Sequence, residues 1–450
     1  MVFMPKLLVW NLDIQSLNLY NAGMVNVQEE EEKKARCLLV GAPNRNNEEP
    51  KELRGLVDTL GMETVDSIVL ARIEPTPTYG IGTGKAQEIA NRAKEVFADC
   101  IIFDWEISPS KQRNWEKLCG INVFDRNEVI IRIFAQRAQT KEAALQVQLA
   151  QLTYSLPRLS HMYGDLARQR GGNYGAKGSG ETQLELDRRQ IEDKIIQIKK
   201  ELSQVAVNRQ TQRKQRERTA TASCALVGYT NAGKSSLLNS LTGADAFVED
   251  KLFATLDPTT RKFAISEASQ VLLTDTVGFI SNLPHTLIDA FRSTLEEAAL
   301  ADLLLVVVDS SDENCEKQYT QVLKVLEEIN ADKIPRLVVL NKMDRIKGDD
   351  LLMSRLETSF PGAIKISAAT GEGFEDLVSA MTENLLGTRA NYVVPMDRSD
   401  LVEAVRKNGT IESEEWLEDG VHLVARIPGH VDERGNCSTK TLSLLRPYEI

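Results

Sequence analysis

The strongest constraint on how this chain can fold is the segment GYTNAGKSS at residues 228–236. It follows a short apolar run at residues 224–227, which predicts a β-strand, and it leads into helix-forming sequence. Gly-x-x-x-x-Gly-Lys-Ser in this setting predicts a phosphate-binding loop, because Gly228 and Gly233 let backbone N–H groups surround a phosphate chain. A chance Gly-Lys-Ser turn would need neither the strand nor the helix. We therefore expect a nucleotide here, with Lys234 reaching the β- and γ-phosphates and the Ser235 hydroxyl ligating Mg²⁺. The other loop residues expected to bind it are Tyr229, Thr230, Asn231 and Ala232.

The base is indicated by Asn341-Lys342-Met343-Asp344, which directly follows an apolar run at residues 337–340. A carboxylate at a strand end can accept hydrogen bonds from the ring N–H and the exocyclic amine of guanine, whereas adenine lacks that pair of donors. Asp344 therefore predicts GTP rather than ATP, with Asn341 bracing the neighbouring loops and Lys342 packing its stem along the base. A second strand end leads into Ser367, Ala368 and Ala369, whose backbone can donate to the guanine oxygen.

Two segments between these motifs are expected to handle the γ-phosphate. One is Asp275-Thr276-Val277-Gly278, where Asp275 suits Mg²⁺ through a water molecule and the Gly278 N–H suits the phosphate. The other is Phe253-Ala254-Thr255-Leu256-Asp257, in a polar, proline-containing segment that predicts a mobile loop. We assign the Thr255 hydroxyl as the second Mg²⁺ ligand, with Thr259 and Thr260 as rivals, and expect the γ-phosphate and Mg²⁺ to order the loop. Lys234, Thr255 and Gly278 are the expected catalytic residues.

The residue after Gly278 is unusual for such an enzyme. Ras-like GTPases carry a glutamine there that orients the attacking water, and this chain carries Phe279. Phenylalanine can neither donate nor accept a hydrogen bond, so intrinsic hydrolysis should be slow. Backbone, another loop or a partner would then position the water, or Phe279 is a core residue and a remote side chain does so.

Length and composition predict a soluble chain of about three domains. Its longest apolar run, residues 303–308, is much shorter than the roughly 20 residues of a membrane span, and the N-terminus lacks the pattern of a signal peptide. The six cysteines are scattered, with Cys37 and Cys224 inside predicted strands, and read as reduced core thiols. The four histidines form no metal-ligand grouping. We expect a cytoplasmic monomer without stable membrane insertion.

Charge is distributed unevenly along the chain. Residues 140–220 hold fifteen Lys or Arg and nine Asp or Glu, a net charge of +6 in a protein whose total is −11. The rest of the chain therefore carries −17. An acidic body with one basic projection avoids non-specific RNA binding while directing one element at a polyanion.

The basic segment is expected to form an antiparallel helical hairpin. Two sets of apolar residues each repeat at spacings of four and three, which is typical of narrow helix–helix seams. They are Leu145, Leu149, Leu152, Leu156 and Leu159, and Ile191, Ile195, Ile198, Leu202 and Val205. The loop at residues 160–181 is rich in glycine and contains Arg168, Arg170 and Lys177, which suit RNA phosphates, and Tyr163 and Tyr174, which could stack on bases. A solvated linker with a flexible tip is the alternative.

The flanking regions predict two smaller α/β domains. Strands at 37–40, 67–70, 100–103 and 122–124 alternate with helices at 51–60, 86–97 and 110–118, which indicates a parallel sheet. Gly82-Thr83-Gly84-Lys85 opens one of these helices and favours a plain turn over a second phosphate loop, although a second nucleotide or an RNA phosphate stays possible there. Near the C-terminus, strands at 392–395 and 421–427 flank a helix at 399–407. The predicted domains are residues 1–139, 140–220, 221–388 and 389–450.

The chain resembles the HflX family of translational GTPases over nearly its whole length. The resemblance rests on LPRLSHMYGDLARQRGG and GSGETQLELDRR in the hairpin, and on FATLDPTTR, DTVGFI, NKMD and SAATG in the GTPase region. The family usually has a proline where this chain has Ser179, a difference that could make the tip more flexible. The resemblance implies GTP hydrolysis coupled to binding of the large ribosomal subunit. It also implies that the hairpin reaches ribosomal RNA and helps to separate subunits or rescue stalled ones.

A second hypothesis is a GTP-dependent switch whose hairpin binds proteins without contacting ribosomal RNA. Leucine seams with charged flanks suit either hypothesis, and glycine, arginine and tyrosine at the tip favour RNA.

Overall fold

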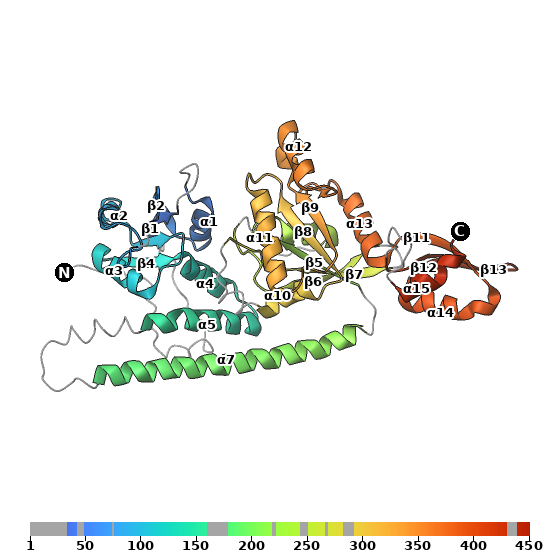
Figure 1. Cartoon of the computed structure of the whole chain (residues 1–450), viewed down its shortest axis with the longest axis horizontal. Helices are drawn as coiled ribbons and strands as arrows, with labels where there is room; N and C mark the ends of the chain where they lie inside the picture. Colours follow the sequence, from blue (N-terminus) through green and yellow to red (C-terminus); the bar gives the residue numbers. More distant parts are fainter. Residues whose placement is uncertain are drawn as a thin grey trace, which may run out of the picture. The chain divides into compact units, whose positions relative to one another are not determined.

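The computed structural model describes residues 34–42, 49–73, 76–159, 179–217, 222–243, 251–265, 269–281, 292–429 and 439–450 (Figure 1). Two compact units divide the chain, residues 1–132 and residues 133–450. The four-part domain division stays a prediction.

The first unit holds a parallel sheet in the order β2-β1-β3-β4. Its core packs α2 and α3 through residues such as Ile89 and Trp115 onto strand residues such as Ile101 and Val123, as the alternating pattern predicts. The elements are β1 (Arg36–Gly41), α1 (Lys51–Thr59), β2 (Glu63–Val69), α2 (Thr83–Glu95), β3 (Cys100–Phe103), α3 (Pro109–Cys119), β4 (Asn122–Asp125) and α4 (Arg126–Arg137), the last of which crosses into the second unit.

Two details of the first unit differ from the sequence prediction. The second strand begins at Glu63, earlier than the predicted strand at 67–70, and α4 was not predicted. The glycine-rich segment forms the start of α2, with Gly82 at the N-cap position and no side-chain cap. This placement agrees with the favoured prediction, a turn that opens a helix.

The predicted helical hairpin is confirmed. It consists of α5 (Lys141–Ser155), a short 3₁₀ turn η2 (Leu156–Arg158) and the long helix α7 (Ser179–Glu217), and Figure 1 shows α5 lying along α7. Leu149, Leu152 and Leu159 pack against Ile191 and Ile198 in one buried cluster, with Leu145, Leu156, Ile195 and Leu202 at its margin. These are the two predicted seams without Val205. The Thr140 hydroxyl caps α5 by accepting a 3.1 Å hydrogen bond from the Ala143 N–H.

The region expected to bind GTP contains a six-stranded sheet in the order β10-β9-β8-β5-β7-β6, in which the described pairs are parallel except for β6 with β7. Helices α8 and α13 cover one face, and α10 and α11 cover the other. The register pairs Leu226 with Asp275 and Asp309 with Asn341, so the carboxyl ends of four strands meet at one edge. The elements are β5 (Ser223–Gly228), α8 (Lys234–Thr242), β6 (Thr259–Ala264), β7 (Gln270–Asp275), α10 (Arg292–Ala299), β8 (Leu303–Asp309), α11 (Cys315–Glu328), β9 (Arg336–Asn341), η3 (Met343–Ile346), α12 (Asp350–Ser359), β10 (Ile364–Lys365) and α13 (Phe374–Leu386).

A small antiparallel sheet in the order β11-β13-β12 ends the chain, with α14 and α15 packed on it. Its elements are β11 (Arg389–Val394), η4 (Met396–Arg398), α14 (Ser399–Asn408), β12 (Thr410–Leu417), β13 (Gly420–Arg426), α15 (Lys440–Leu445) and η5 (Arg446–Tyr448). The sequence predicted β11, α14 and β13 and missed the edge strand β12.

The described cysteines are buried free thiols, as predicted, and Cys437 lies outside the described residues. Burial raises the pKa of Cys37 to about 12 and that of Cys119 to about 11. Such thiols are poor nucleophiles at neutral pH. Among the helices that the structure describes, none is long and apolar enough to span a bilayer.

Candidate functional site

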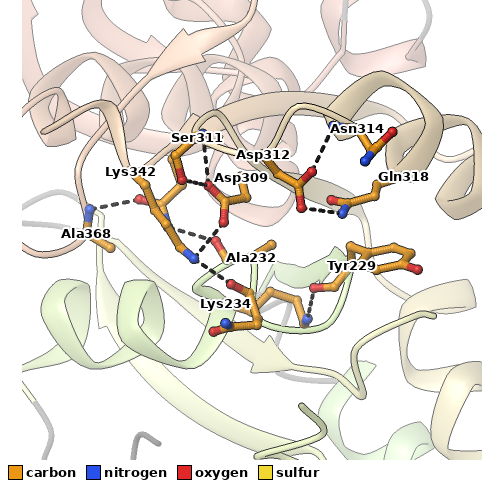
Figure 2. A network of polar contacts seen from close by, with 12 residues as sticks. Tyr229, Ala232, Lys234, Asp309, Ser311, Asp312, Asn314, Gln318, Lys342 and Ala368 are labelled. Atoms are coloured by element: carbon orange, nitrogen blue, oxygen red, sulfur yellow. Dashed lines mark hydrogen bonds and ion pairs between the residues drawn. The ribbon is translucent and has the colours of Figure 1, made fainter. Parts of the chain in front are cut away.

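The phosphate-binding loop joins β5 to α8 as the sequence predicts. Gly233 adopts φ 94°, and a Cβ atom there would lie 2.3 Å from Asn341 Nδ2, so only glycine fits without displacement. Lys234 Nζ folds back over the loop and donates to the carbonyl oxygen of Gly228 at 3.2 Å. It also donates to the carbonyl oxygen of Tyr229 at 2.9 Å (Figure 2). The first N–H groups of α8 face the same space, which favours an anion.

Lys234 and Asp275 are both buried at this edge of the sheet, with exposed fractions of 6% and 2%. Burial lowers the pKa of Lys234 to about 8, against the opposite effect of the Asp275 charge. Burial also raises the pKa of Asp275, and Lys234 and the Ser235 hydroxyl oppose that rise. Burial therefore disfavours the charged forms of both Lys234 and Asp275. A phosphate bound beside the lysine and a cation bound beside the carboxylate would stabilise those charges.

Three oxygen donors converge where the sequence predicts the metal. The Ser235 hydroxyl lies 2.8 Å from the Thr255 hydroxyl and donates a 2.6 Å hydrogen bond to Asp275 Oδ2. The second oxygen of Asp275 is buried without a hydrogen-bond partner in the part of the chain that the structure describes. Hydroxyl and carboxylate oxygens are the ligands that Mg²⁺ prefers, so this donor set fits Mg²⁺.

The two rival threonines lie elsewhere. Thr259 and Thr260 begin β6, and the Thr260 hydroxyl lies 3.0 Å from the Thr274 hydroxyl of the neighbouring strand. Thr255 is thus the threonine of this segment whose hydroxyl meets Ser235.

The segment after β7 is attached to the phosphate loop through its backbone. The Phe279 N–H donates to the Gly228 carbonyl at 3.1 Å, and the Phe279 carbonyl accepts from the Thr230 N–H at 2.7 Å. A Cβ atom on Gly278 would lie 2.7 Å from Thr230 Cα and 3.0 Å from Lys234 Nζ, so glycine permits this close approach. The Tyr229 hydroxyl extends the attachment by accepting a 2.7 Å hydrogen bond from the Ser281 N–H.

These bonds fix the direction of Phe279. Its side chain is 1% exposed and packs with Val227, Leu295 and Val306 in the core between the sheet and α10. Of the two alternatives in the sequence, the structure favours Phe279 as a core residue.

Asn341 braces two loops, as predicted. Its Nδ2 donates to the Ala232 carbonyl at 2.9 Å, and its Oδ1 accepts from the Ala368 N–H at 2.9 Å. The Ala368 N–H is therefore already engaged, and its assignment to the guanine oxygen stays a prediction. Nearby, the Ser367 hydroxyl donates a 2.6 Å hydrogen bond to Asp344 Oδ1, which orients the carboxylate expected to recognise the base.

Asp309 is a contributor that the sequence reasoning missed. It ends β8, and its Oδ2 forms a 2.7 Å ion pair with Lys342 Nζ (Figure 2). Lys342 Nζ also donates to the Asn231 carbonyl at 2.8 Å. The Ser311 N–H and hydroxyl both donate to Asp309 Oδ1. The sequence signal that could have identified Asp309 is an acidic residue directly after the apolar run 303–308. The strand formed by that run lies between strands whose ends carry motif residues.

A cavity of about 240 Å³ lies where these segments meet. It is lined by Thr230, Asn231, Gly233, Lys234, Ser235, Ser236, Lys251, Phe253, Ala254, Thr255, Thr276, Gly278, Lys342 and Arg345. Ser236, Lys251 and Arg345 were not predicted. A larger hollow of about 560 Å³ between α13 and the C-terminal sheet contains none of the motif residues, so its size does not make it the site.

Several motif residues have side chains that do not line this cavity. Those of Tyr229, Leu256, Val277 and Met343 are buried in the core. The Asp257 carboxylate accepts hydrogen bonds from Gln139 and Thr140 at the start of α5. Their roles in nucleotide binding stay predictions, as does that of Ala369. The predicted RNA-binding residues Arg168, Arg170 and Lys177, with Tyr163 and Tyr174, lie outside the described residues.

Comparison with protein families gives three matches along the chain. Residues 47–135 match the N-terminal region of GTP-binding GTPases, and residues 137–216 match their middle region. Residues 223–342 match a family described as 50S ribosome-binding GTPase.

Similar proteins cover nearly the full length. The protein named GTPase HflX from Akkermansia muciniphila is 44% identical over 423 residues, which cover 90% of this chain and 97% of that protein. GTPase HflX from Escherichia coli strain K12 is 42% identical over 397 residues, covering 88% and 93%. Among solved structures, a GTP-binding protein from the archaeon Sulfolobus solfataricus in complex with GDP is 26% identical with a TM-score of 0.42, covering 78% of this chain and 98% of that chain.

Proposed function

The chain belongs to the HflX family of GTPases, and we propose that it uses GTP binding and hydrolysis to control its association with the large ribosomal subunit. The expected consequence is ribosome splitting, rescue or recycling by a monomer in the cytoplasm. The description of the family matched by residues 223–342, 50S ribosome-binding GTPase, supports the choice of partner.

GTP and GDP are proposed to occupy the cavity beside Lys234. Its ammonium would contact the β- and γ-phosphates, the Gly278 N–H would donate to the γ-phosphate, and the Asp344 carboxylate would accept from guanine. Ser235 and Thr255 would hold Mg²⁺ directly, and Asp275 through a water molecule. When bound, Mg²⁺ neutralises charge that develops on the phosphate oxygens.

The observation that carries the nucleotide assignment is the meeting of three separate motifs at one point. Ser235 comes from the phosphate loop, Thr255 from the following loop and Asp275 from the end of β7. The Thr255 hydroxyl and the Asp275 carboxylate both lie within hydrogen-bond distance of the Ser235 hydroxyl. Such convergence of oxygen donors beside a buried lysine suits phosphoryl transfer.

The basic hairpin supports the proposed contact with ribosomal RNA. Residues 140–220 carry a net charge of +6 while the whole chain carries −11. A basic helix pair in an acidic protein favours one site of contact with a polyanion over general adsorption.

The test replaces Arg168, Arg170 and Lys177 with glutamine and measures binding to purified large subunits across a salt series, with a non-hydrolysable GTP analogue present. If the three side chains contact phosphates, the slope of log affinity against log salt should fall in magnitude by roughly two to three units. The affinity for the GTP analogue alone should not change. A matched control replaces three basic residues on or after α11, Lys324, Lys333 and Arg336, with glutamine.

If the slope of log affinity against log salt is unchanged in the hairpin variant, the three side chains of the tip do not contact RNA phosphates. Loss of affinity in both triple variants would indicate a general charge effect instead. If neither variant nor the wild type binds subunits, the protein-binding switch becomes the better account of the hairpin.

A further inference from the structure

The loop expected to meet Mg²⁺ also contacts the start of the hairpin. This switch loop, Phe253-Ala254-Thr255-Leu256-Asp257, has Thr255 at its centre, facing Ser235. The residue two positions before Thr255 contacts the last turn of α4, and the residue two positions after it contacts the short segment between α4 and α5. We call the contacted residues, Phe134, Gln139 and Thr140, the loop seat.

The first contact is between aromatic rings. The Phe253 ring meets the Phe134 ring at the end of α4 edge to face, with centroids 4.7 Å apart and planes at 82°. Both side chains are 2% exposed, so the contact is part of a core. Phe253 is also tied to the phosphate loop, because its N–H donates a 2.8 Å hydrogen bond to the Thr230 hydroxyl.

The second contact is made by the Asp257 carboxylate. Oδ2 accepts from the Gln139 N–H at 3.0 Å and the Thr140 N–H at 3.2 Å, and Oδ1 accepts from the Thr140 hydroxyl. These donors lie just before α5, whose first turn Thr140 caps through Ala143. A carboxylate at the N-terminal end of a helix is further stabilised by the helix dipole.

The two contacts restrict Thr255 from both sides. Two residues of extended chain span only about 7 Å, so an anchored Phe253 and an anchored Asp257 leave Thr255 little freedom to leave Ser235. The short chain thus couples two events. When the switch loop docks on the loop seat, the Thr255 hydroxyl is presented to the metal site.

We propose that Phe253 and Asp257 are positioning residues that seat the switch loop on the α4–α5 junction, so that GTP binding is coupled to the first turn of the hairpin helix α5. Because coupling between two sites is reciprocal, GTP stabilises the docked loop and the first turn of α5, and the intact seat strengthens GTP binding. GDP binding does not require Thr255, so the affinity for GDP does not depend on the loop seat. The inference goes beyond the proposed function, since it concerns contacts within this chain and needs no ribosome.

The test uses Thr140, which belongs to no nucleotide motif. Thr140→Val keeps the shape of the side chain and removes the hydroxyl that donates to Asp257, and Thr140→Ser restores it. The dissociation constants of GDP and of a non-hydrolysable GTP analogue are measured with Mg²⁺ for the full-length protein. Thr140→Val should weaken binding of the GTP analogue roughly fivefold and leave GDP binding unchanged. Thr140→Ser should behave as the wild type.

Thr439→Val is the matched control. The Thr439 hydroxyl also caps a helix, α15, by accepting from the Leu442 N–H, and it also donates to a distant acceptor, the Pro428 carbonyl at 2.9 Å. Its loss should leave both affinities unchanged. If Thr140→Val weakens GDP and the GTP analogue equally, the seat has only a structural role and the proposal fails.

Hydrogen exchange of the wild type decides the matter independently of how well any variant folds. Backbone amides of residues 139–146 should exchange more slowly with the GTP analogue than with GDP, and the same difference should vanish in Asp257→Asn. Equal exchange of this segment in the two nucleotide states of the wild type would overturn the proposal.

Discussion

The Ser235 hydroxyl lies 2.8 Å from the Thr255 hydroxyl, although Ser235 belongs to the first turn of α8 and Thr255 lies 20 residues further along the chain. This contact distinguishes Thr255 from Thr260, which instead pairs with Thr274 inside the sheet. We expect Thr255→Ala to slow single-turnover GTP hydrolysis roughly 100-fold, the usual cost of removing one group that stabilises the transition state. Thr260→Ala should stay within about threefold of the wild type. Hydrolysis is measured across a Mg²⁺ titration. If Thr260→Ala slows it more than Thr255→Ala does, Thr260 is the second metal ligand.

Lys234 and Ser235 act from the phosphate loop itself. Lys234→Ala and Ser235→Ala should each abolish measurable hydrolysis, because such contacts contribute about 3 kcal/mol or more to transition-state stabilisation. The assay is phosphate release under single-turnover conditions at saturating GTP. Turnover retained by both variants would place the active site elsewhere.

Proton uptake on nucleotide binding follows from the lowered pKa of Lys234, about 8. Near pH 6.5 the ammonium is already charged before a phosphate arrives, so binding takes up no proton at this group. As pH rises through 8 the free amine must be protonated for binding, and GDP affinity should fall by up to about tenfold per pH unit. Calorimetry in two buffers of different ionisation enthalpy measures the uptake at pH 8.5.

The control for that titration is Lys234→Arg, because a guanidinium stays protonated over this range. It should bind GDP without proton uptake at this position. If the wild type also takes up no proton at pH 8.5, Lys234 is charged in the free protein.

Sequence motifs predicted the nucleotide loop, the base-recognition segment and the hairpin seams because each is a contiguous or periodic pattern. Asp309 lacked such a pattern, since its role depends on β8 lying beside β9. The contact made by Asp257 was missed for a related reason. Asp257 follows Thr255 in a nucleotide motif, yet its hydrogen-bond partner Thr140 is 117 residues away in sequence, and no local pattern reports such a contact.

Phe279 illustrates how backbone pairing decides a side-chain role. Its backbone hydrogen bonds to Gly228 and Thr230 leave the ring packed in the core. We therefore expect Phe279→Gln to leave hydrolysis no faster than in the wild type and to destabilise the fold by about 2–4 kcal/mol, since it buries an amide among apolar side chains.

Chemical unfolding and single-turnover kinetics measure the two effects of that substitution. Phe279→Leu, which keeps an apolar side chain, should cost less than about 1.5 kcal/mol. A glutamine variant that is as stable as the wild type and hydrolyses GTP faster would show that this side chain can reach the attacking water.

Recognition of guanine is proposed to rest on Asp344, whose carboxylate is held by Ser367. Asp344→Asn exchanges an acceptor for a donor, so GTP binding should weaken sharply and xanthosine triphosphate binding should improve. Competition binding with both nucleotides provides the measurement. Wild-type GTP affinity in the variant would remove Asp344 from base recognition.

The central claim, a GTPase that acts on the large ribosomal subunit through its hairpin, is tested most directly by co-sedimentation with separated subunits. Wild-type protein and a variant with residues 160–181 replaced by a short Gly/Ser loop are each loaded with GDP or a non-hydrolysable GTP analogue. We predict that the wild type sediments with large subunits, more with the GTP analogue than with GDP, and that the variant binds the analogue normally but fails to sediment. Equal sedimentation of the two proteins in every nucleotide state would contradict the account.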